Sequence, residues 1–205
     1  MKLYRATLEA KGYLHFYATE YLKTTRVSDL LHNWALMFAL NDVHGNPELT
    51  HLENLRRVTF YCTAATQRVA NRRTYLRNPV PEDTGAGKMG LMEIEYYLPG
   101  STFELHILSR DGSEPPEMIL YGKKRVPCRI HATAESFRPH SELSVRPAHA
   151  INPLDYDHIS EVSYAKKIPM RPSPVYYVSA KFSNILVQDR SRIVVPNMEE
   201  SLQWN

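Results

Sequence analysis

Two basic stretches of the chain carry the residues best suited to chemistry, and that chemistry is the binding of phosphate. The first stretch, residues 56–77, contains no acidic residue. Its basic residues are Arg56, Arg57, Arg68, Arg72, Arg73 and Arg77. Arginine neutralises phosphates, and the interleaved Tyr61 and Tyr75 can stack on unpaired bases. The stretch predicts an RNA-binding surface, and the alternative is an ordinary solvated helix or loop face.

The second basic stretch is Gly122-Lys123-Lys124-Arg125, which stands in a segment, residues 118–134, that also lacks acidic residues. Residues 113–122 predict a short helix, because proline is tolerated in a first turn and Gly122 suits a helix end. Cations there would complement the helix dipole. Three in a row exceed that need, and a glycine lets a phosphate approach the backbone. We therefore expect Gly122, Lys123, Lys124 and Arg125 to contact RNA.

Residues 84–90 form a glycine-rich segment around Lys88. A phosphate-binding loop of the nucleotide-hydrolase type is excluded, because Met89 follows the lysine and Glu82 takes the place of the first glycine. Lys88 is predicted instead as an RNA contact on a loop. The whole of 64–90 has no clean period, and we expect a mobile basic insertion that becomes ordered on RNA.

Other candidate sites favour structural roles. The nine histidines show neither HxH nor HExxH spacing, so no metal site or cofactor is predicted. His32-Asn33 is expected to bond to backbone groups of a neighbouring segment, and Asn152 and Asp155 are interpreted as turn formers. The two cysteines are expected to be reduced and buried, as in a cytosolic protein.

The elements that must position these residues follow from periodicity. Strands are predicted at residues 3–10, 13–18, 58–63, 126–133, 175–180 and 192–195. A core helix over the apolar run 34–40 is expected to begin at Ser28-Asp29. Residues 92–98 and 103–107 predict a hairpin that turns at Pro99-Gly100. The order favours a single α+β domain over 1–205 with a largely antiparallel sheet.

The chain begins directly with an alternating strand, which predicts no signal peptide. It contains no apolar run of the ~20 residues that a membrane helix needs, so no membrane contact and a cytoplasmic location are expected. Net charge is only +3, but acidic residues concentrate between the two basic stretches. This division predicts a basic face and an acidic face, and a basic face suits a polyanion.

Three segments together resemble one known family. They are residues 31–40 (LHNWALMFAL), 119–128 (ILYGKKRVPC) and 151–155 (INPLD). The chain resembles the small type I-D CRISPR-associated subunits called Csc one, which are the I-D members of the wider Cas five group. The first segment is close to that family's LHN-aromatic-AL pattern, the second is shared across the wider group, and the third is short.

The resemblance implies an RNA-holding role without catalysis, in antiviral defence. Such subunits cap a Cascade surveillance complex and grip the five-prime handle of the crRNA. Their fold is a ferredoxin-like, RNA-recognition-type core with a protruding thumb, which is expected here within 64–90. The implied partners are a Cas ten-like large subunit and a Cas seven-like backbone subunit, while contact with target DNA stays open.

One rival interpretation is an enzyme, a metal-independent endoribonuclease that processes repeat RNA. Such catalysis needs an acid and a base close together in space. Tyr121 and His131 flank the second basic stretch and are the candidate pair. A further alternative is a basic subunit of an unrelated ribonucleoprotein.

Overall fold

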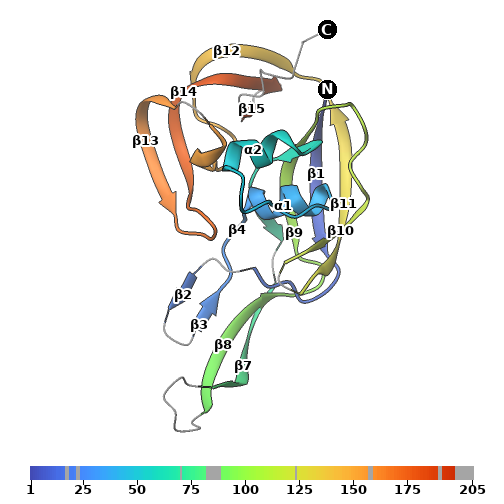
Figure 1. Cartoon of the computed structure of the whole chain (residues 1–205), viewed down its shortest axis with the longest axis vertical. Coiled ribbons are helices and arrows are strands. Elements are labelled where there is room, and N and C mark those ends of the chain that lie inside the picture. The colour runs from blue at the N-terminus through green and yellow to red at the C-terminus, as the bar shows by residue number, and fades with distance from the viewer. Residues whose placement is uncertain are drawn as a thin grey trace.

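The computed structural model describes residues 1–16, 19–21, 24–69, 71–81, 89–122, 124–156, 159–188 and 191–196, without the side chains of 19–21, 24, 75–81, 89–92 and 142. The described residues form three β-sheets with few helices, and nearly all strand pairs are antiparallel (Figure 1). The expected α+β class with a largely antiparallel sheet is therefore confirmed.

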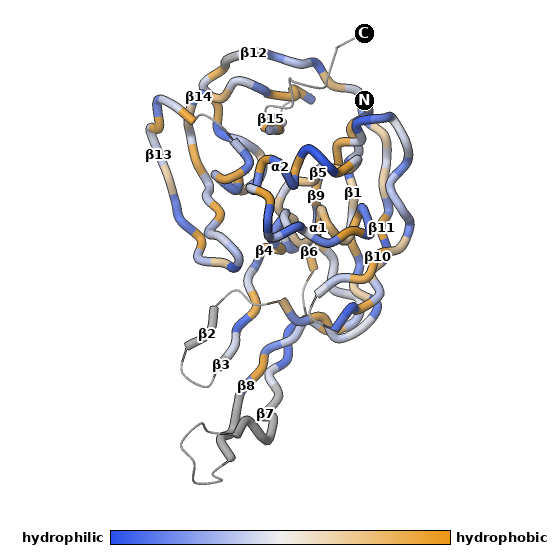
Figure 2. The backbone as a smooth tube through the Cα atoms, in the orientation of Figure 1, coloured by the Kyte–Doolittle hydropathy of each residue, from blue (hydrophilic) through white to orange (hydrophobic). Residues whose placement is uncertain are grey.

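The main sheet has the order β10-β11-β1-β9-β6-β4, and β5 also pairs with β9. Its strands are β1 (Lys2–Ala10), β4 (Leu30–Leu31), β5 (Phe60–Cys62), β6 (Ala65–Val69), β9 (Thr102–Ser109), β10 (Met118–Tyr121) and β11 (Val126–Glu135). The predicted alternation of β1 is confirmed, since Tyr4, Ala6 and Leu8 are buried and Arg5 is exposed. Figure 2 shows hydrophobic and hydrophilic positions alternating along the strands.

Helix α1 (Asn33–Leu40) lies across the main sheet (Figure 1) and buries Leu36, Met37 and Leu40 in the core shared with β1 and β9. Burying each such side chain contributes about 1.5–3 kcal/mol. The short helix α2 (His51–Arg56) follows, and Thr50 begins it with a capping box.

The predicted start of the core helix at Ser28-Asp29 is wrong. His32 is the N-cap, and its Nδ1 accepts a hydrogen bond from the Trp34 backbone N–H at 3.1 Å. The two residues before it, Leu30 and Leu31, pair with β6 as a strand instead. Leu30 and Leu31 are apolar like the run 34–40, so only the sheet partner shows that they form a strand rather than the first turn of the helix.

The second sheet has the order β12-β14-β13, and β15 also pairs with β14. It consists of β12 (Arg138–Val145), β13 (Ser160–Ile168), β14 (Val175–Gln188) and β15 (Ser191–Val194). The two late predicted strands are confirmed. Val175 packs with Leu30 and Ala64, so this sheet is joined to the edge of the main one. The 3₁₀ helix η1 (Pro153–Asp155) precedes β13.

The third sheet has the order β2-β3-β8-β7, with β2 (Thr19–Tyr21), β3 (Thr24–Arg26), β7 (Arg72–Pro81) and β8 (Met89–Tyr97). Strands β7 and β8 form a hairpin that projects away from the rest of the molecule (Figure 1). We call this hairpin the arm. The prediction of loop at 78–81 is wrong, because these residues belong to β7, and the loop predicted at 84–90 ends where β8 begins at Met89. Residues 82–88 lie outside the described part.

Three further expectations need correction. Strands at 92–98 and 103–107 exist, but β8 pairs with β7 and β3 while β9 pairs with β1, β5 and β6, so they form no hairpin together. Residues 113–122 form no helix, because 118–121 pair with β11 as β10. Of 13–18, only Leu14 makes a bridge, to Tyr97, and 17–18 lie outside the described part. Strand pairing by distant segments overrides each of these local patterns.

None of the helices in the described part is long and apolar enough to cross a membrane.

Candidate nucleic-acid interface

The base of the arm brings the two predicted basic stretches together. Arg73 lies directly opposite Tyr96 in the β7–β8 pair, so both side chains point to the same face. Lys124, from the turn between β10 and β11, places its Nζ 5.8 Å from the centroid of the Tyr96 ring. Cations within ~6 Å of an aromatic face are attracted by its quadrupole. Two exposed cations from distant segments are therefore placed at one tyrosine, Lys124 over its ring and Arg73 opposite it on the neighbouring strand.

The turn that carries Lys124 has a fixed shape. Gly122 adopts φ +78°, and the Arg125 backbone N–H donates to the Gly122 carbonyl at 3.0 Å. A Cβ at Gly122 would lie 2.8 Å from Leu14 Cδ1 and 3.0 Å from the His15 carbonyl oxygen. Glycine is therefore required at position 122 by the positive φ of this turn and by the close contact with Leu14 and His15, and not by a helix end as predicted. Lys124 and Arg125 are both exposed on this turn.

His15 completes the base of the arm. Its ring centroid lies 5.2 Å from that of Tyr96, and its Nδ1 is 2.9 Å from the Glu95 carbonyl oxygen. Sequence reasoning missed both His15 and Tyr96. The available signal was the Tyr96-Tyr97 pair at the end of an alternating strand, because alternation turns two adjacent rings to opposite faces.

Arg72 points to the opposite face from Arg73 and is engaged in structural contacts. Its guanidinium forms an ion pair with Asp29, a hydrogen bond with Gln67 and a cation–π contact with the Tyr97 ring at 5.4 Å. These contacts attach β7 to the main sheet and neutralise part of the charge of Arg72. The alternation of a strand therefore separates two adjacent arginines that the sequence grouped together.

Arg68 lies elsewhere, on the face of the main sheet that points away from α1. Its Nη2 is 2.5 Å from Glu104 Oε1, and Arg5 reaches the same carboxylate at 3.2 Å. The hydrogen bond from Arg68 is the main reason that the pKa of Glu104 is lowered. Lys11 is similarly paired with Glu9 at 2.6 Å. The Glu104 and Glu9 carboxylates on this face are therefore each engaged by cations of the same face.

The remaining predicted contacts have no described side chains. Tyr75 and Arg77 lie on β7, and their side chains are outside the described part. Lys88 and Lys123 lie outside the described residues altogether.

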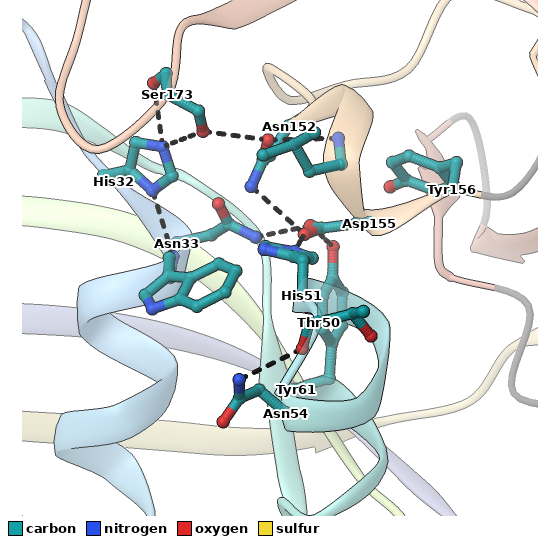
Figure 3. A network of polar contacts seen from close by, with 12 residues as sticks. His32, Asn33, Thr50, His51, Asn54, Tyr61, Asn152, Asp155, Tyr156 and Ser173 are labelled. Atoms are coloured by element: carbon teal, nitrogen blue, oxygen red, sulfur yellow. Dashed lines mark hydrogen bonds and ion pairs between the residues drawn. The ribbon is translucent and has the colours of Figure 1, made fainter. Parts of the chain in front are cut away.

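A buried polar network joins the two halves of the chain (Figure 3). Its centre is the Asp155 carboxylate, which is only 1% exposed. Oδ2 accepts from Asn33 Nδ2 at 2.6 Å and from the Tyr61 hydroxyl at 3.0 Å. Oδ1 contacts His51 Nε2 at 2.6 Å and accepts from Asn152 Nδ2 at 3.2 Å. Burial also raises the pKa of Tyr61, which keeps its hydroxyl protonated as a donor.

His32 extends this network to the loop before β14. Since Nδ1 accepts from the backbone of α1, the proton resides on Nε2, which lies 3.0 Å from the Ser173 carbonyl oxygen and 3.1 Å from its hydroxyl. Burial lowers the pKa of His32 to about 4, so the ring is neutral. The Ser173 hydroxyl in turn donates to Asn152 Oδ1 at 3.1 Å. The expected backbone bond is confirmed for His32 and the turn role for Asn152, which begins η1. The expectation is wrong for Asn33, whose side chain bonds to the Asp155 carboxylate and not to a backbone group, and Asp155 is the centre of the network rather than only a turn former.

The rival catalytic pair is not brought together. Tyr121 is 1% exposed and lies opposite Val126 at the start of β11, and burial raises its pKa far above the usual value. His131 is exposed and lies five residues farther along the same strand. At ~3.3 Å per residue the two positions are about 17 Å apart, beyond the reach of a shared proton transfer.

Comparison with known proteins gives one family. The model of the family described as type I-D CRISPR-associated protein Cas5/Csc1 matches residues 1–203. No curated protein matches the chain. Two of the three segments on which the sequence resemblance rests, 31–40 and 151–155, meet in the buried network, so they share a structural role.

Proposed function

The chain belongs to the type I-D CRISPR-associated Cas5/Csc1 family, and we propose that it grips the five-prime handle of the crRNA in a type I-D surveillance complex without cleaving it. The observation that carries this proposal is the placement of two exposed cations at Tyr96, Lys124 over its ring and Arg73 opposite it in the β7–β8 pair. Phosphate contacts supply most of the affinity of a protein for a nucleic-acid backbone, and exposed arginine and lysine side chains make them.

The arm acts as the thumb in this proposal. A phosphate at its base would contact Arg73 from β7 and Lys124 from the β10–β11 turn at once, with Arg125 beside them. Tyr96 is 8% exposed, so its part is to position the two cations rather than to stack on a base. Tyr75, Arg77, Lys88 and Lys123 are further proposed RNA contacts.

The core is proposed to be of the ferredoxin-like, RNA-recognition type. Four strands of the main sheet have the order β11-β1-β9-β6, and α1 lies between β1 and β6 in the chain, as in a split βαβ unit. The second connection of that fold would carry a helix, whereas β10 occupies it here. The face of this sheet opposite α1 presents ion pairs such as Arg68–Glu104, which favours the arm over the sheet face as the RNA contact.

The partners follow from the family rather than from the geometry. We propose a Cas ten-like large subunit and a Cas seven-like backbone subunit, a cytoplasmic location, and no catalytic step. Contact with target DNA is left to experiment.

The test is the affinity of the purified chain for a synthetic handle RNA, measured by fluorescence anisotropy over a series of salt concentrations. Reversing the charge at Arg73 and Lys124 (R73E with K124E) should weaken binding by about tenfold or more per site. The salt slope should flatten by about 0.7 for each phosphate of the single strand that the variant no longer neutralises.

The matched control reverses two exposed lysines of β13, Lys166 and Lys167 (K166E with K167E), which changes the net charge equally in a different sheet. It should leave handle binding within about twofold of wild type. Equal losses in both variants would mean that net charge alone attracts the RNA, and the arm base would be rejected as the site. Cleavage of repeat RNA by the wild-type chain would reject the non-catalytic role.

A further inference from the structure

Strand β11 has an outer edge that is open beyond its pairing with β10. Two hydrogen bonds establish which backbone groups point there. The Ile130 N–H donates to the Glu117 carbonyl at 2.7 Å, away from β1, whereas the Pro127 carbonyl accepts from the Lys11 N–H at 2.9 Å, toward β1. The backbone N–H and C=O groups of successive residues point alternately to the two edges of a strand, and the β1–β11 register is continuous. The N–H and C=O groups of the even-numbered residues of β11 therefore point to the edge away from β1.

Ala132 and Ala134 therefore present their N–H and C=O groups at this open edge. The pairing of β10 ends at Met118–Arg129, and no described strand continues beside β11 beyond that point. Both alanines are exposed, and their small side chains leave the backbone accessible. An open row of alternating donors and acceptors is a template for another extended chain.

A groove of about 650 Å³ lies along this edge. It is lined by residues 129–134 of β11, by Tyr4, and by Glu114, Pro115 and Glu117. Its outer wall, residues 113–117, is held in place because the Tyr4 hydroxyl donates to the Ser113 carbonyl at 3.1 Å and Asp111 Oδ1 accepts from the Ser113 N–H at 2.9 Å. The wall and the strand edge thus bound a preformed slot.

The charges of the slot select its occupant. Glu114 and Glu117 are exposed on the wall, and neither forms an ion pair within the described part of the chain. Arg129 and His131 also line the slot, but Arg129 lies opposite Glu9 of β1 and His131 Nε2 is 4.0 Å from the Glu9 carboxylate. The two wall carboxylates therefore favour a lysine or arginine side chain over a nucleic acid. The slot also lies on a different strand segment from the Arg73–Lys124 site at the base of the arm.

We propose that this slot is a docking site for an extended basic segment of a partner protein, which adds as a strand to β11 at Ala132 and Ala134 and places a cation between Glu114 and Glu117. Main-chain hydrogen bonds give such docking its affinity, and the side-chain charges give it specificity. The inference rests on the proposed function only in taking the partner to be a subunit of the same complex.

The experiment uses overlapping short peptides that tile the other protein subunits of the host's type I-D system, each titrated against the full chain by fluorescence anisotropy. Ala132→Pro removes one N–H that points to the open edge and leaves the hydrogen bonds to β1 in place. Proline is tolerated at such an edge position because its missing N–H has no partner in the sheet. Ala132→Ser keeps the N–H and is the matched control. Glu114→Lys with Glu117→Lys tests the charge without touching the strand.

We expect a basic peptide to bind, about tenfold more weakly to the Ala132→Pro variant and to the double lysine variant, and unchanged to Ala132→Ser. All these variants should bind the handle RNA as the wild-type chain does. If the wild-type chain does not bind the handle RNA, the proposed function is rejected, whereas the docking proposal depends only on the peptide titrations. The docking proposal is overturned if no peptide binds, if Ala132→Pro binds as wild type does, or if the edge instead pairs with a second copy of the chain or crosslinks to RNA.

Discussion

Replacing Asp155 by asparagine tests whether the buried network holds the two halves of the chain together. Each carboxylate oxygen serves two polar neighbours: Asn33 and Tyr61 at Oδ2, His51 and Asn152 at Oδ1. An amide keeps the shape but replaces one oxygen with an NH₂ group, so one of these pairs of neighbours no longer has its acceptor.

The energetic cost follows from that change. Hydrogen bonds to a charged group contribute about 1.5–3 kcal/mol each, and disrupting a buried charged network costs about 3–5 kcal/mol. Asp155→Asn should therefore lower the free energy of unfolding by about 3–5 kcal/mol, a large share of the roughly 5–15 kcal/mol that a domain has. Tyr61→Phe removes one donor and should cost about 1–2 kcal/mol.

Urea unfolding followed by circular dichroism measures both changes. In the double variant the charged acceptor of Tyr61 is already gone, so the cost should fall short of the sum of the two single variants by about 1 kcal/mol. A decrease below about 1 kcal/mol for Asp155→Asn, or strict additivity in the double variant, would refute the view that this carboxylate organises the network.

Three further outcomes are expected. Burial lowers the pKa of His32 and His149 to about 4 from the ordinary 6.5, so the unfolded chain takes up protons first as the pH falls. The contribution of each neutral ring to the free energy of unfolding is complete above about pH 6.5 and is lost as the pH falls toward 4. The loss between pH 7 and 5 should be about 2 kcal/mol per histidine, and urea unfolding midpoints measured across this pH range would reveal it. Gly122→Ala should destabilise the fold by about 1–3 kcal/mol and lower the melting temperature, because φ is positive and the added Cβ contacts Leu14. Cys62 is 0% exposed with a raised pKa, so a thiol reagent should label it only when the chain opens; rapid labelling of the native protein would contradict this.

Local periodicity predicted much of the secondary structure. The alternation of β1, the apolar run of α1 and the β-branched segments of β5 and β14 all appeared where expected, because burial of one face imposes period 2 or 3.6 directly on the sequence. The predictions fail where distant strands pair: β8 pairs with β7 and not with β9, and residues 118–121 of the predicted helix pair with β11 as a strand. Which strand pairs with which depends on long-range contacts that no local window contains.

The candidate site divides in the same way. From the sequence alone came the two basic stretches, their chemistry, the family resemblance and the structural roles of His32-Asn33, because residue types and spacing carry that information. The tertiary structure decided that Lys124 lies over the Tyr96 ring opposite Arg73, that Arg72 and Arg68 pair with Asp29 and Glu104, and that β11 keeps an open edge. These are properties of register and of sheet order, which arise only when distant segments pack against each other.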